Sequence, residues 1–171
     1  MRTRILALLS LAALLVIAFD CITDDLSILL NVKPLNATYA VNPGPPSYAG
    51  SVTIDRRSLY DESYTLTGVS VSDIKLSTNG PDLGAFSGTV RVNGVILFTY
   101  SGDWTAFNTP QSVLTSRLLT KNQPGIDALI NTVIEQRSVV LTVSGDVRTA
   151  PAAKNTNSVT VYASVQAYGH R

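Results

Sequence analysis

The sequence predicts a mostly β chain that folds as an antiparallel β-sandwich with one late amphipathic helix and one short helical turn. Seven or more short segments alternate apolar with polar residues, which is typical of strands buried on one face. Turn signals rich in Gly, Pro and Asn separate these segments. One segment, residues 124–136, changes to the helical period. A mature chain of about 150 residues buries enough surface to fold without a metal or a disulfide.

The first twenty residues have the composition of a signal peptide. Arg2 and Arg4 place positive charge at the start, and fifteen apolar or weakly polar residues follow, from Ile5 to Phe19. This stretch is short for a membrane span, which needs about 20 residues. Cys21, the only cysteine of the chain, comes directly after Asp20.

Residues 1–21 resemble a bacterial lipoprotein signal, in which the cysteine becomes the lipidated first residue of the mature chain. The resemblance implies removal of residues 1–20, lipidation at Cys21, and a lipid-anchored domain in the bacterial cell envelope, at the outer membrane or the periplasmic face. Asp20 departs from the small residue that this family prefers before the cysteine. An ordinary signal peptide or an uncleaved anchor is therefore the alternative, and either one still exports the domain.

We expect residues 21–50 to hold the lipidated N-terminus and the first strands, and residues 51–171 to complete the same domain. Alternating apolar residues predict strands at 22–32 and 35–41, and the alternative for the first segment is a tether that runs from the membrane to the domain. The Pro- and Gly-rich string 42–46 cannot continue a ladder, so it ends the second strand. A short third strand is predicted at residues 51–55.

The middle of the chain predicts one long strand and one hairpin. Along residues 64–76 the apolar positions shift from odd to even numbers at Ser72-Asp73, which indicates a bulge or a bend. A turn follows at residues 79–82. The segments 86–92 and 95–101 flank Asn93-Gly94, the strongest short signal for a hairpin with a type I′ turn.

Helical signals lie between residues 109 and 136. Thr109-Pro110 predicts a short helical turn that runs to residue 119, and residues 124–136 predict a longer helix. Its apolar residues form one stripe, which we assign to the core: Ile126, Leu129, Ile130, Val133 and Ile134. Strands at 138–147 and 158–167 close the domain.

The stretch 125–168 reads GIDALINTVIEQ, then RSVVLTVSGDV, a loop, and SVTVYASVQAY. This order of helix and alternating strands resembles small envelope lipoproteins of Bacteroidetes-type bacteria. It is also similar, more weakly, to the water-stress β-sandwich domain. The resemblance implies a lipid-tethered, immunoglobulin-like domain without an established activity, so it contributes no catalytic residues.

Composition argues against several classes of function. The net charge is +1 with no basic run beyond Arg56-Arg57, which disfavours nucleic-acid binding. A single cysteine and a single histidine, His170, leave no set of ligands for zinc and no Cys/His nucleophile pair. We therefore expect no enzyme, no cofactor and no metal site.

Two functional classes remain. The first is a structural or protein-interaction module of the envelope, with a membrane contact through the lipid and a protein partner. The second is a small-ligand or glycan-binding domain that uses the aromatic loop 100–107. Its candidate contact residues are Tyr100, Asp103, Trp104 and Phe107, because aromatic side chains are enriched where proteins meet partners. The alternative is that Trp104 and Phe107 cap the core.

Overall fold

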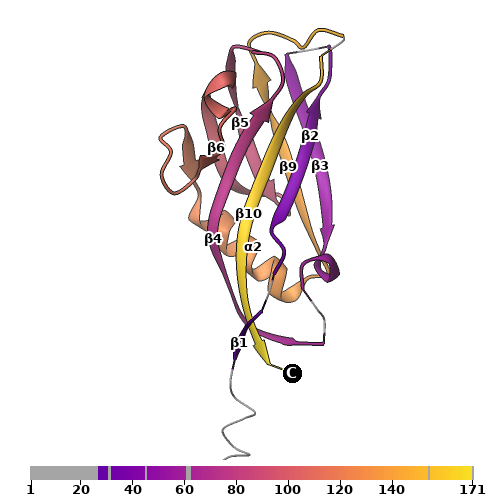
Figure 1. Ribbon diagram of the computed structural model, residues 1–171, viewed down its shortest axis with the longest axis vertical. Coiled ribbons are helices and arrows are strands. Elements are labelled where there is room, and N and C mark those ends of the chain that lie inside the picture. Colours follow the sequence, from indigo (N-terminus) through magenta and orange to yellow (C-terminus); the bar gives the residue numbers. More distant parts are fainter. Residues whose placement is uncertain (1–26, 31, 45, 61–62, 154, 171) are drawn as a thin grey trace, which may run out of the picture.

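The computed structural model describes residues 27–30, 32–44, 46–60, 63–153 and 155–170 (Figure 1). Two antiparallel sheets pack face to face, so the predicted β-sandwich is confirmed. The predicted signal segment and Cys21 lie outside the described residues. Within these ranges, no helix has the length and apolar character that a membrane crossing requires.

Sheet A is built around its last strand. β10 pairs with β4 on one side and with both β1 and β2 on the other, and β4 pairs with the short β7. The strands of sheet A are β1 (Ile28–Leu30), β2 (Leu35–Val41), β4 (Thr65–Asn79), β7 (Gln111–Ser112) and β10 (Asn157–His170).

Sheet B has the order β3-β9-β5-β6-β8. Its strands are β3 (Ser47–Asp55), β5 (Ala85–Val92), β6 (Val95–Asp103), β8 (Leu119–Lys121) and β9 (Ser138–Val147). Two 3-10 helices, η1 (Arg56–Ser58) and η2 (Trp104–Phe107), and the helix α2 (Gln123–Glu135) complete the described part of the chain.

Several local predictions are confirmed. The strands at 35–41 and 138–147 have the predicted bounds. Asn93 and Gly94 both have positive φ, 46° and 86°, as a type I′ hairpin turn requires. In the β4–β10 ladder Asp73 faces Ser164 while Val71 faces Val165, so the predicted bulge lies at Ser72.

The short helical turn lies earlier than predicted, at Trp104–Phe107, and residues 109–119 do not form a helix. Part of the backbone of that segment bonds to the edge of sheet A, and the part after it forms a turn in which the amide of Ser116 donates to the carbonyl of Ser112. Gln111 and Ser112 pair with β4, and the amide of Val113 donates to the carbonyl of Ile74 at 2.8 Å. Pairing with a sheet edge overrides the helical signal of Thr109-Pro110.

Helix α2 packs inside the sandwich against β6 and β4, but on a face rotated from the predicted stripe. Leu129 and Val133 are fully buried, whereas Ile130 is half-buried and Ile134 is 36% exposed. Gly125 explains the rotation. A Cβ at this position would overlap the backbone of β6 at Ile96 and Leu97. The helix can therefore pack closely against this strand only with Gly125, which has no side chain, at the contact.

The core of sheet B contains a row of four residues in register across four strands: Tyr48, Gly145, Gly88 and Tyr100. The two tyrosine rings reach toward each other over the two glycines, and their hydroxyl groups are hydrogen-bonded. A Cβ at Gly88 would lie 2.7 Å from Cζ of Tyr100. Burial raises the pKa of both hydroxyls, so the pair stays neutral.

The buried face of α2 gives a direct stability test. Leu129→Ala should lower the free energy of unfolding by about 2–5 kcal/mol, because it leaves a cavity in a packed core. Ile134→Ala, on the same helix but partly exposed, should cost less than about 1.5 kcal/mol. Urea unfolding followed by circular dichroism measures both changes, and equal losses would contradict the rotated face.

Candidate functional site

The aromatic residues predicted as a contact site lie in the core. Trp104 and Phe107 are 0% exposed and Tyr100 is 3% exposed. All three rings surround Phe86, with ring centroids 4.8 to 5.1 Å from its own. The structure therefore agrees with the alternative prediction, in which Trp104 and Phe107 cap the core. The buried rings offer no surface on which a glycan can stack.

Asp103 is exposed and precedes η2 without capping it, because its side chain makes no hydrogen bond to the helix. The backbone of Trp104 holds this segment instead. Its amide donates to the carbonyl of Gly84, and its carbonyl accepts from the hydroxyl of Thr78, each at 2.8 Å. The loop thus closes one end of the sandwich with buried side chains.

A shallow groove lies on the outer face of sheet A, the face turned away from sheet B. Its volume is about 340 Å³, and its lining residues are Asn36, Lys75, Ser77, Pro110, Thr160 and Tyr162. Strand register positions them. Tyr162 of β10 lies between Asn36 of β2 and Lys75 of β4, and Thr160 lies directly opposite Ser77. Side chains two residues apart share a face of a strand, so these rows form one continuous surface.

The groove is polar with little net charge. Lys75 alone is charged among the six described lining residues, and its ammonium group lies 3.4 Å from the carboxylate of Asp73. The hydroxyls of Thr38 and Thr160 bond to each other at 3.0 Å in the neighbouring row. The surface therefore offers amide and hydroxyl groups around one tyrosine ring.

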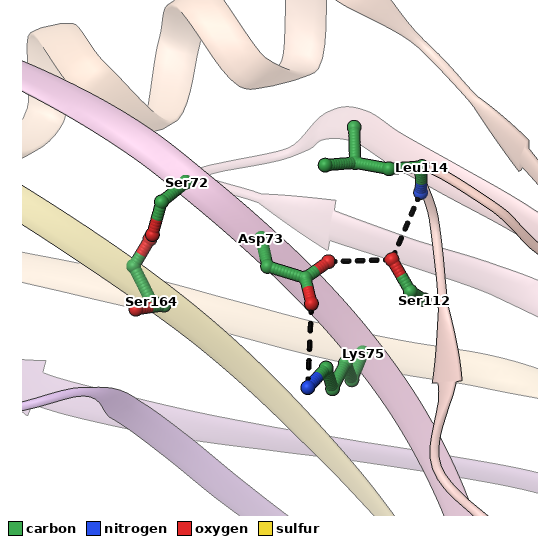
Figure 2. A network of polar contacts seen from close by, with 6 residues as sticks. All are labelled: Ser72, Asp73, Lys75, Ser112, Leu114 and Ser164. Carbon is green, nitrogen blue, oxygen red and sulfur yellow. Dashed lines mark hydrogen bonds and ion pairs between the residues drawn. The ribbon is translucent and has the colours of Figure 1, made fainter.

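Figure 2 shows how the edge of this surface is held. Asp73 accepts a hydrogen bond of 2.6 Å from the hydroxyl of Ser112 in β7, and the same hydroxyl accepts from the amide of Leu114 at 3.1 Å. Beside it, at the bulge, the hydroxyl of Ser72 donates to the carbonyl of Ser164 at 3.2 Å. The contact between Ser112 and Asp73 attaches β7 to β4 at the rim of the sheet, and the contact between Ser72 and Ser164 joins β4 to β10.

The geometry of this network is that of a structural contact. Ser112 donates directly to a carboxylate, with no imidazole between them to accept its proton, so its hydroxyl is not set up as a nucleophile. In the part of the chain that the structure describes, no group of three His, Cys, Asp or Glu side chains is arranged to hold a metal.

Sequence reasoning missed the groove residues, although one signal pointed to them. The strand pattern at 158–167 placed Val159, Val161 and Val165 on one face, so Thr160 and Tyr162 had to point to the other. What the sequence did not show was that Asn36 and Lys75 flank Tyr162. Their positions depend on register between strands far apart in the chain.

Comparisons with protein families, with curated proteins and with solved structures find no match to this chain.

Trp104 is the only tryptophan of the chain, so its fluorescence tests the buried aromatic loop. We expect a blue emission maximum and weak quenching by acrylamide in the folded state. Trp104→Ala should lower the free energy of unfolding by about 3–5 kcal/mol. Asp103→Ala, its exposed neighbour, should stay within about 0.5 kcal/mol of the parent chain. A red, strongly quenched signal would return the loop to the candidate sites.

Proposed function

We propose that this chain is an exported, membrane-tethered, non-enzymatic β-sandwich that acts as a structural or protein-interaction module of the bacterial cell envelope. In this proposal it is a lipoprotein of the kind that small Bacteroidetes-type envelope proteins represent. The observation that carries the interaction role is the polar groove on the outer face of sheet A.

The tether is supported by the sequence before the described residues. A charged start, fifteen apolar residues and the single cysteine come in the order of a lipoprotein signal. The first described residue, Ser27, follows Cys21 by six positions. The domain would then stand close to the membrane that holds the lipid.

The interaction role is supported by the character of the outer face of sheet A. The groove is lined by hydroxyl and amide groups, and the charge of its lining residue Lys75 is balanced by the neighbouring carboxylate of Asp73. Removing water from such a face costs less free energy than removing it from a face with unpaired charges, since burying a charge costs far more than burying a hydrogen-bonded hydroxyl. A protein partner can therefore cover it.

A second candidate function is glycan binding, moved from the loop 100–107 to the groove. Tyr162 is partly exposed on the central strand, with Asn36 and Thr160 beside it. An aromatic ring that faces solvent among amide and hydroxyl groups offers a stacking surface and hydrogen-bond partners together. Tyr162 has this arrangement, and the buried Trp104 does not.

The tether predicts a lipidated mature chain. Intact mass of the protein purified from its native envelope should correspond to a chain that begins at Cys21 and carries acyl groups. More than one acyl chain is expected, because a single chain gives only marginal membrane binding. Cys21→Ser should release the domain into the soluble fraction. An unlipidated chain that begins at another residue would refute the proposal.

The groove predicts a binding defect without a folding defect. Tyr162→Ala should weaken capture of the envelope partner at least tenfold, while thermal unfolding stays within a few degrees. Thr53→Ala, on an exposed position of sheet B, is the matched control and should bind like the parent chain.

The same pair of variants separates the two candidate functions when each is tested on envelope proteins and on a glycan array. Loss of glycan binding alone, with protein capture unchanged, would favour the second function. Unchanged binding of Tyr162→Ala in both assays would remove the groove from either function.

A further inference from the structure

The two long strands of sheet A continue beyond α2 and form a three-stranded tip with β1 (Figure 1). We define the tip as residues 28–30 of β1, 65–69 of β4 and 167–170 of β10. Three apolar residues of the tip face solvent: Ile28 is 47% exposed, Leu29 is 61% exposed and Tyr168 is 39% exposed. They form a local apolar surface.

These side chains lie on both faces of the tip. Leu29 lies directly opposite Tyr168 on the outer face, and Ile28 shares the inner face with the buried Leu30. Gly68 sits beside Tyr168 in the next strand and adds no side chain, so the ring is left uncovered on that side. A strand with consecutive apolar residues cannot bury both faces in one sandwich, because successive side chains point in opposite directions.

The tip holds three of the six large apolar side chains that are exposed in the described part of the chain, and the other three, Val95, Leu114 and Ile134, lie elsewhere. Along the same outer face of β10, the residues further from the tip are Gln166, Ser164 and Tyr162, and the groove beyond is polar. A solvated sheet face is ordinarily polar throughout. The tip thus departs from the rule at the one place where the chain enters the domain.

We propose that the tip rests on the surface of the lipid bilayer, with Ile28, Leu29 and Tyr168 in the boundary between head groups and acyl chains. This inference rests on the proposed tether at Cys21. Ser27 follows Cys21 by six positions, so even a fully extended chain holds the lipidated residue within about 22 Å of Ser27, which directly precedes the tip. The hydroxyl of Ser27 bonds to that of Thr67 at 2.9 Å, which fixes the entering chain to β4.

The side chains match the chemistry of a bilayer surface. Tyrosine is enriched at membrane interfaces because its ring is apolar and its hydroxyl reaches water. Aliphatic side chains beside it add buried apolar area to an acyl anchor that is weak by itself. Contact at the tip then sets the orientation. Tyr162 lies six residues along β10 from Tyr168, which holds the groove about 20 Å above the lipid.

The test uses the full chain, reconstituted in phospholipid vesicles that carry brominated acyl chains. Leu29→Trp places a reporter at the tip. Leu114→Trp is the matched control, because Leu114 is 60% exposed and lies far from the tip. Its neighbour Val113 bonds to Ile74, which is about 20 Å along β4 from the tip. Trp104 is buried in both variants and contributes a constant background. We expect bromine to quench the added emission of Leu29→Trp several-fold more than that of Leu114→Trp.

Flotation of the vesicles, run in parallel, separates the two proposals. A chain that floats with equal quenching at both positions overturns the contact at the tip and leaves the tether standing. A Cys21→Ser chain that still floats, with Leu29→Trp quenched, supports the tip and refutes the need for lipid. A wild-type chain that fails to float overturns both. A concentration-dependent change in Leu29→Trp emission without vesicles would assign the surface to a second copy of the chain and overturn the inference.

Discussion

The ladder between β4 and β10 is the constraint on which the rest of this structure depends. Thirteen residue pairs connect the two strands, from Ser158 opposite Asn79 to His170 opposite Thr65. No other strand of the described chain is as long as either of them, so their two ends have different surroundings. One end faces sheet B and forms the core, and the other passes α2 and meets β1. The core, the groove and the tip are three parts of one pair of strands.

The core contains aromatic residues that, from the sequence alone, are candidates for a contact surface. Phe86 lies at the centre, and the rings of Tyr48, Tyr100, Trp104 and Phe107 contact it from three elements. Large rings bury much apolar area, and their edge-to-face contacts add to it. Space for them comes from residues without side chains, as Gly88 and Gly145 show. An aromatic cluster in sequence is therefore not evidence of a binding surface when glycines oppose it.

Local signals predicted most of the fold. Alternation of apolar residues predicted the strands, and Asn93-Gly94 predicted the hairpin. The shift of apolar positions from odd to even numbers at Ser72 predicted the bulge. Predictions went wrong where a distant segment decides the outcome. The face of α2 depends on the close approach of Gly125 to β6. Residues 109–119 form no helix, because residues 111–112 pair with the edge of β4 and most of the segment after them forms turns. The groove needs the register of three strands, which no local pattern contains.

The position of β10 also determines when the fold can form. The first two strands of the described chain, β1 and β2, pair only with β10, the last one. Sheet A therefore closes through contacts between residues more than 100 positions apart, such as Leu35 with Ala163. Contacts of such sequence separation make folding slow, because loop closure precedes any gain from pairing. Sheet A cannot be assembled until the C-terminal residues are available. In the export that we propose, the first strands would therefore stay unpaired until the last strand has crossed the membrane.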